Sequence, residues 1–258
     1  MGYKLQTLIS LSFRTLLLLT ILMIAACRQT PTTEVPELAT SPTPSIAPTT
    51  PPPSPDPQAA AKLRQQGLNY RQQSRFSDAI TALEEAVQLD PQNISGRVLF
   101  GWTLHLAGKE TEAAQALKEA LIQDPEHIPA LNALGIVYLV DGQLQSAIAT
   151  HERAIELKPD NEIAHYNLAL AYHRLEDYQL ALDRSKQATK LEPNNPHPWV
   201  ALALVYWSEG SKTEAQQAYA KARQLDARYR QSSYLSHLIQ AGFTDEQIAS
   251  VEEIRMSQ

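Results

Sequence analysis

The chain has little of what catalytic and disulfide-stabilised proteins depend on. One cysteine in 258 residues excludes an intramolecular disulfide. The sequence has no GxSxG elbow, no Walker loop and no HExxH motif, so the common hydrolase, nucleotide and zinc-protease signatures are absent. Acidic residues outnumber basic ones by 28 to 22, and a net charge of −6 argues against a nucleic-acid-binding surface. We therefore expect a protein without catalytic residues, cofactor or metal.

Strand signals are also absent, because the β-branched residues are scattered through helical periodicity. What the chain does have is a repeat. Four prolines stand 34 residues apart, at Pro91, Pro125, Pro159 and Pro193. A fixed period of this length is typical of a helical-hairpin solenoid. With each proline at position 32, residues 60–229 divide into five units: 60–93, 94–127, 128–161, 162–195 and 196–229.

Small residues recur at fixed positions of these units. Position 8 holds Gly67, Gly101, Gly135, Ala169 and Ala203. Position 20 holds Ala79, Ala113, Ala147, Ala181 and Ala215, and position 27 holds Ala86, Ala120, Ala154, Ala188 and Ala222. Larger residues there would push neighbouring helices apart, so the pattern favours close helix packing within and between units.

With Gly or Ala at position 8, Ala at 20 and 27, and Pro at 32 in all but the last unit, which has Ala227, the five units resemble the tetratricopeptide repeat. The resemblance implies an all-α fold, a right-handed superhelical solenoid of five helix-turn-helix units. Each unit is expected to form one helix at positions 2–14 and a second at 18–31. Residues 230–258 then read as capping helices, with a helix ending at Gly242 and a capping box between Thr244 and Gln247.

The amino terminus has the pattern of a secretory signal. Lys4 and Arg14 precede an apolar run of about a dozen residues, which is short for a membrane-spanning helix. The run ends in Ile24-Ala25-Ala26-Cys27, which resembles the lipobox of bacterial lipoproteins. The resemblance implies a signal peptide at 1–26 and a lipidated Cys27, whose acyl chains would anchor the protein stably in a membrane. The alternative is a plain signal anchor with an incidental cysteine.

Residues 27–58 form the predicted tether between this anchor and the repeats. Ten of the 17 prolines lie between residues 28 and 58, interleaved with Thr and Ser. Such a segment has too little apolar surface to form a core and favours an extended conformation. O-glycosylation of its Thr residues and recognition of a PxxP motif remain open alternatives.

The resemblance also implies where a partner would bind. In this family the first helix of each unit lines a concave groove, with positions 2, 5, 9, 12 and 13 facing into it. Carried onto this chain, the candidate groove residues are Val98, Trp102, His105, Asn132, Ile136, Leu139, Tyr166, Leu170, His173, Arg174, Leu204 and Trp207. The set is apolar and aromatic, as binding patches are. The alternative is that several of these residues pack between units or under the carboxy-terminal helices.

Histidines do not suggest a metal centre. His105 and His173 lie two units apart, so the repeat should hold them beyond shared ligand distance. His151 and His165 replace packing residues, and we expect them to be structural histidines with satisfied hydrogen bonds.

The sequence thus predicts a non-enzymatic adaptor of the bacterial cell envelope, which binds a segment of another protein and is held at the membrane through Cys27. Arg28 after the cysteine slightly favours the outer membrane. The alternative function is activation of an envelope or cell-wall enzyme by direct contact. The two differ in the partner that the protein would capture: an assembly subunit or an enzyme.

Overall fold

A computed structural model describes residues 54–258 of the chain. The predicted signal peptide, Cys27 and the predicted tether as far as residue 53 lie outside the described residues. Within 54–258 the chain consists of helices joined by short turns, and no strand is present.

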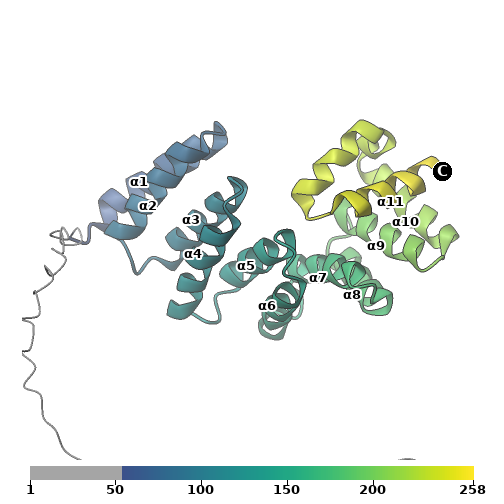
Figure 1. The fold of residues 1–258 in the computed structure, drawn as a ribbon, viewed down its shortest axis with the longest axis horizontal. Helices are drawn as coiled ribbons and strands as arrows, with labels where there is room; N and C mark the ends of the chain where they lie inside the picture. The colour runs from purple at the N-terminus through teal and green to yellow at the C-terminus, as the bar shows by residue number, and fades with distance from the viewer. Residues whose placement is uncertain (1–53) are drawn as a thin grey trace, which may run out of the picture. The chain divides into compact units, whose positions relative to one another are not determined.

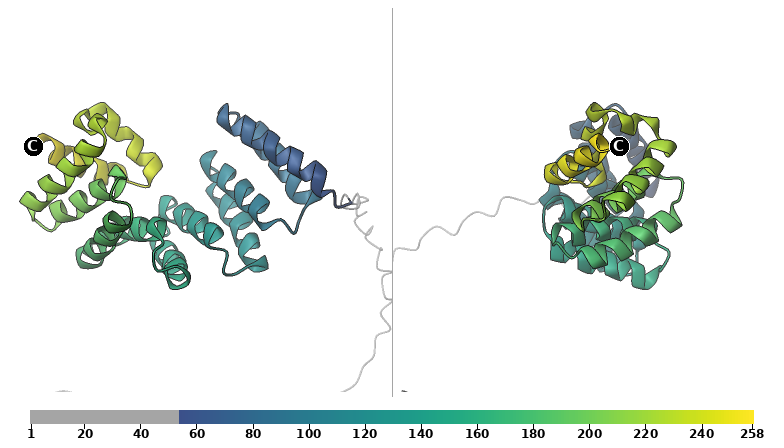
Figure 2. Two further views of the ribbon diagram at one scale, coloured as in Figure 1. Left: turned by 180° about the vertical axis from the view of Figure 1, so that it is seen from behind. Right: turned by 90° about the vertical axis from the view of Figure 1, so that its right-hand side faces the viewer.

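Ten α-helices form five antiparallel hairpins that follow one another in a curved row (Figures 1 and 2). Their bounds are α1 Pro57–Gln72, α2 Phe76–Leu89, α3 Ile94–Leu106, α4 Glu110–Gln123, α5 Ile128–Val140, α6 Leu144–Leu157, α7 Glu162–Arg174, α8 Tyr178–Leu191, α9 Pro196–Ser208 and α10 Lys212–Leu225. The solenoid of helical hairpins expected from the sequence is confirmed.

From α2 onwards the helices begin and end one residue earlier than the sequence predicted, at positions 1–13 and 17–30 of each unit. The residue at position 34 explains the early start of the first helices. The side chains of Asn93, His127 and Asn161 each accept a hydrogen bond from the backbone N–H three residues on, so each caps a helix that begins at the next residue. In the first hairpin, Asp56 caps α1 in the same way, and the helix begins at Pro57, inside the predicted tether.

Close approach of the two helices in a hairpin requires the small residue at position 8. A side-chain carbon added to Gly67 would lie 2.6 Å from Leu83 Cγ, and one added to Gly101 would lie 2.8 Å from Leu117 Cγ. Both leucines occupy position 24 and are fully buried. The glycine on the first helix therefore makes room for the leucine on the second.

The hairpins stack through their neighbours. Among the first helices, α3 packs on α5, α5 on α7 and α7 on α9, while each second helix also contacts the first helix of the next hairpin. The alanines at positions 20 and 27 of the second helices have almost no exposed surface. At the start of the row, α1 packs chiefly on α2, and α2 forms the junction with α3.

The C-terminal segment (residues 231–258) follows a short 3₁₀ turn, η1 Ala227–Arg230, at the end of the row. It comprises a 3₁₀ helix, η2 Ser232–Ala241, and a final helix, α11 Asp245–Met256. Gly242 joins them with a φ of +88°, a left-handed conformation that glycine adopts without strain. Thr244 and Gln247 form the predicted capping box at the start of α11. The segment's buried apolar side chains are Leu235, Leu238, Phe243, Val251 and Ile254.

Candidate binding surface on the inner face of the array

The first helices of the hairpins line the inner side of the curved row, with α6 and α8 on the outer side of α5 and α7 (Figure 1). We call the surface that α1, α3, α5, α7 and α9 present the inner face. Its two halves differ, because the C-terminal segment packs on α9 and reaches back to α7.

Three polar contacts fix the C-terminal segment on α7 and α9. Tyr166 donates its hydroxyl hydrogen to the carbonyl of Ala241 across 2.6 Å. The side-chain amide of Gln247 lies 3.0 Å from His173 Nδ1. Trp207 donates its indole N–H to a carboxylate oxygen of Glu253 at 3.0 Å. These contacts and the buried leucines below them make the segment part of the folded array.

The segment covers much of the groove that the sequence predicted. Tyr166, Leu170, His173, Leu204 and Trp207 all lie on α7 and α9, where it docks. Leu139, Leu170 and Leu204 are 0%, 1% and 0% exposed. The prediction that these three leucine side chains line an accessible groove is wrong, because they are part of the core.

Most of the polar candidates are engaged within the chain. Asn132 and Asn161 exchange two side-chain hydrogen bonds, of 2.9 and 3.3 Å, so Asn132 fixes the start of α7. His105 Nδ1 lies 2.7 Å from a carboxylate oxygen of Glu110. Arg174 donates to the carbonyl of Leu139. These side chains hold helices and turns in place.

The other half of the inner face is open. Val98, Trp102 and Ile136 are half-buried on α3 and α5. Leu106 and Val140, at position 13 of the same two helices, are 42% and 44% exposed. We call these five residues the open patch. Two neighbouring first helices thus present apolar side chains to solvent.

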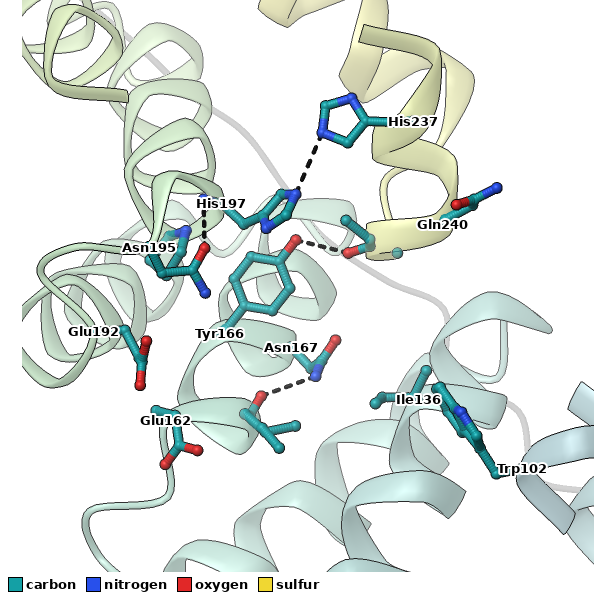
Figure 3. Close-up of a pocket in the computed structure, with 14 residues that line it drawn as sticks. Trp102, Ile136, Glu162, Tyr166, Asn167, Glu192, Asn195, His197, His237 and Gln240 are labelled. Carbon is teal, nitrogen blue, oxygen red and sulfur yellow. Dashed lines mark hydrogen bonds between the residues drawn. The ribbon is translucent and has the colours of Figure 1, made fainter. Parts of the chain in front are cut away.

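A pocket of about 530 Å³ joins the open patch to the covered half. Its walls come from α3, α5, α7, α9, the α8–α9 turn and η2 (Figure 3). The apolar lining is Trp102, Ile136, Ile163, Tyr166, Pro198, Ala241 and Gly242, and the polar lining is Glu162, Asn167, Glu192, Asn195, His197, His237 and Gln240. In Figure 3 Trp102 and Ile136 lie at one side of the pocket and the two glutamates at another, with Tyr166 and Asn167 between them.

Of these pocket residues, sequence reasoning named Trp102, Ile136 and Tyr166. It missed His197, although that residue occupies position 2, another position that faces the groove in this family. It also missed Glu162 and Glu192, because positions 1 and 31 are not groove positions. His237 and Gln240 come from the C-terminal segment. The 34-residue period does not extend into this segment, so it could not predict that the segment packs on the inner face.

Two histidines of this face, His173 and His197, have a pKa below the ordinary value. Burial lowers the pKa of His173 to about 4, and burial followed by the neighbouring His237 lowers the pKa of His197. The two ring nitrogens Nε2 of His197 and His237 lie 3.3 Å apart, and the Tyr229 hydroxyl lies 3.0 Å from the second of them. Since desolvation disfavours the imidazolium form, His173 and His197 contribute hydrogen bonds and no positive charge at neutral pH.

The described residues offer no metal centre, since nowhere in 54–258 do three His, Cys, Asp or Glu side chains gather as a metal site would require. Within the same range, no helix has the length and hydropathy that crossing a membrane requires.

Comparison with known proteins agrees with this architecture. A family model described as the N-terminal TPR repeats region of Psidin matches residues 71–237, more than half of the chain. A crystal structure of MamA is 25% identical, with a TM-score of 0.56 over 63% of this chain and 95% of that one. TTC0263, a thermophilic TPR protein of Thermus thermophilus, is 24% identical, with a TM-score of 0.58 over 71% and 98% of the two chains. None of the curated proteins compared with the chain matches it.

The chain therefore belongs to the tetratricopeptide-repeat family. The family and the fold make it a scaffold for protein–protein interaction, of a kind that is typically non-enzymatic.

Proposed function

We propose that the protein is a lipid-anchored adaptor of the bacterial cell envelope, which binds a segment of a partner protein on the open patch and in the adjoining pocket. The observation that carries this proposal is the contrast between the two halves of the inner face. One half is already filled by the C-terminal segment, and the other keeps apolar side chains in contact with water.

Apolar side chains that stay in contact with water are unfavourable in free energy, and this supports a partner at the open patch. Leu106 and Val140 are more than two-fifths exposed, and Trp102 and Ile136 border a pocket large enough for side chains of another chain. Contiguous apolar surface of this kind commonly marks an interaction site. The C-terminal segment itself illustrates the mode of binding, because it lays a short helix with leucine anchors across α7 and α9.

The anchor and the location rest on the sequence. Ile24-Ala25-Ala26-Cys27 resembles a lipobox, and the proline-rich residues after it would let the array reach away from the membrane surface. Arg28 favours the outer membrane. The second candidate function is activation of an envelope or cell-wall enzyme through the same patch, and the identity of the partner separates the two.

Site-specific photocrosslinking in cells tests the binding surface. A photoreactive residue is placed at Val140 in the open patch, and in the matched control at Ile122 of α4, which is 79% exposed on a second helix. We expect one dominant crosslinked protein from position 140 that is absent from position 122. Crosslinking from position 122 alone would move the working surface to the outer face. Sequencing the crosslinked peptide then shows whether the partner is an assembly subunit or an enzyme.

A further inference from the structure

Position 31, directly after the second helix of each unit, carries a carboxylate in four of the five units: Asp90, Asp124, Glu192 and Asp226. Three of these are used inside the chain. Asp90 accepts from Arg64 and Asn93, Asp124 accepts from a backbone N–H, and Asp226 accepts from Arg228 and Tyr234. Glu192, within the described residues, has no side-chain hydrogen bond or ion pair.

The position of Glu192 makes that isolation unfavourable. Glu192 is the residue that ends α8, and the carboxyl end of a helix carries a partial negative charge. A carboxylate at this end of a helix is not stabilised by the helix dipole, so it needs a nearby cation for stabilisation. Glu192 nevertheless lines the pocket.

Glu162 adds a second carboxylate at the same end of the same hairpin. It begins α7, and α7 packs antiparallel to α8, so residues 162 and 192 lie close together (Figure 3). The cation nearest Glu162 is Lys158, 3.6 Å away, which lies equally far from Asp160 and is 44% exposed. Such a shared, solvated contact contributes little, so this end of the pocket keeps a net negative charge.

The first unit shows how a basic group satisfies this arrangement. There Arg64, at groove position 5, donates to the position-31 carboxylate of Asp90 across 3.0 Å. In the fourth unit, position 5 is Tyr166, whose hydroxyl is bonded to Ala241 instead. The fourth unit therefore has the acceptor of the pair but no donor.

From this we propose that the partner segment carries a lysine or arginine whose charged head binds Glu162 and Glu192, next to a large apolar residue that packs on Trp102 and Ile136. This inference rests on the proposed function and specifies its ligand as a basic–apolar segment of another polypeptide. The glutamates fix the end at which the basic residue enters, and the tryptophan side accepts the apolar one.

Selection from a random heptapeptide phage library on the immobilised full-length chain, in detergent, tests this. We expect enriched peptides to pair Lys or Arg with a large apolar residue and to lack Asp and Glu. The variant Glu162→Gln/Glu192→Gln should bind the best of these peptides roughly tenfold or more weakly, as expected for hydrogen bonds to charged groups. The matched control Glu84→Gln/Glu85→Gln, which removes the same charge from α2, should bind it as the wild type does.

Charge reversal gives an independent measurement. Selection on Glu192→Lys should exchange the basic residue of the enriched peptides for Asp or Glu. Peptides that need Trp102 but carry no basic residue, or that bind equally well to the double glutamine variant, would overturn this inference and leave the proposed function standing. If no selected peptide loses affinity in Trp102→Ala, the proposed binding surface itself is wrong.

Discussion

At the scale of single residues, His151 is a buried imidazole that the sequence leads one to misjudge. We expected a histidine with satisfied hydrogen bonds, but neither ring nitrogen has a partner among residues 54–258, and the side chain is 0% exposed. It occupies position 24 and packs on Gly135, where Leu83 and Leu117 pack on Gly67 and Gly101 in the first two units. The third unit therefore buries two polar atoms where the first two units bury methyl groups.

We predict that His151→Leu stabilises the array. The change removes an unsatisfied buried polar group, which costs about 1–3 kcal/mol, and installs the side chain that fits this position in two other units. Urea denaturation followed by circular dichroism at pH 7.5 should show the gain. A loss of stability would mean that the third unit, unlike the first two, has no room for a leucine at this position.

The same residue makes stability depend on pH. Burial lowers the pKa of His151 in the folded protein to about 3, from an ordinary 6.5. Below pH 6.5 the unfolded chain therefore binds a proton that the folded chain does not, so the stability of the wild type falls as the pH falls. Since each unit of pH is worth roughly 1.4 kcal/mol, the advantage of His151→Leu should grow by about 2 kcal/mol between pH 6.5 and 5.0. An unchanged difference would show that His151 titrates normally.

At the scale of elements, the helices of the C-terminal segment can be predicted from the local sequence, whereas its docking on the array cannot. The sequence predicts its local features, which are a helix up to Gly242 and then a capping box at Thr244 and Gln247. Its docking depends on contacts such as Tyr166 with Ala241, which are 75 residues apart. A capping pattern says where α11 begins, but not that the side chain of Gln247 also reaches His173.

We predict that two adjacent residues of η2 respond in opposite ways to truncation. Leu238 is 0% exposed, so Leu238→Ala should destabilise the docked segment by roughly 2–5 kcal/mol. Ile239 is 46% exposed, and Ile239→Ala should change stability by less than about 0.5 kcal/mol. Urea denaturation followed by tryptophan fluorescence reports this directly, because the indole of Trp207 is bonded to α11. Equal losses in both variants would contradict the observed packing of η2.

The first hairpin is the element that we expect to open most easily. Within α1 the buried residues are Ala60 and Gly67, whereas α5 buries nine of its thirteen residues. Hydrogen exchange should therefore be fastest in residues 60–93 among the five hairpins and slowest around α5, α7 and α9. Protection that is highest in residues 60–93 would be inconsistent with this order.

At the scale of the whole molecule, the period in the sequence was enough for the fold, because each hairpin is set by contacts inside one unit and with its neighbours. The glycines and alanines at positions 8, 20 and 27 specify those contacts. The site also depends on contacts between residues far apart in the sequence. The repeat positions identified Trp102 and Ile136. Residues 231–258, however, pack over Leu170 and Leu204 and complete a pocket whose walls come from several units.

Membrane attachment is a prediction for the whole molecule and rests on Ile24-Ala25-Ala26-Cys27. We expect Cys27→Ala to shift the protein from the detergent-extracted membrane fraction to a soluble or unprocessed form, because the thiol that would carry the lipid is gone. Fractionation and mass spectrometry of the amino terminus measure this. An unmodified amino terminus at another residue of the wild-type protein would rule out the lipoprotein.

The central claim is that a partner binds the open half of the inner face, and the affinity of the crosslinked partner segment for Trp102→Ala/Ile136→Ala tests it most directly. We predict a loss of roughly 2–4 kcal/mol in binding free energy, as for anchor residues, with Ile122→Ala binding as the wild type does. Stability should fall far less than in Leu134→Ala, a core change that costs roughly 2–5 kcal/mol. Unchanged affinity in the double variant, or unfolding as severe as that of Leu134→Ala, would contradict the account.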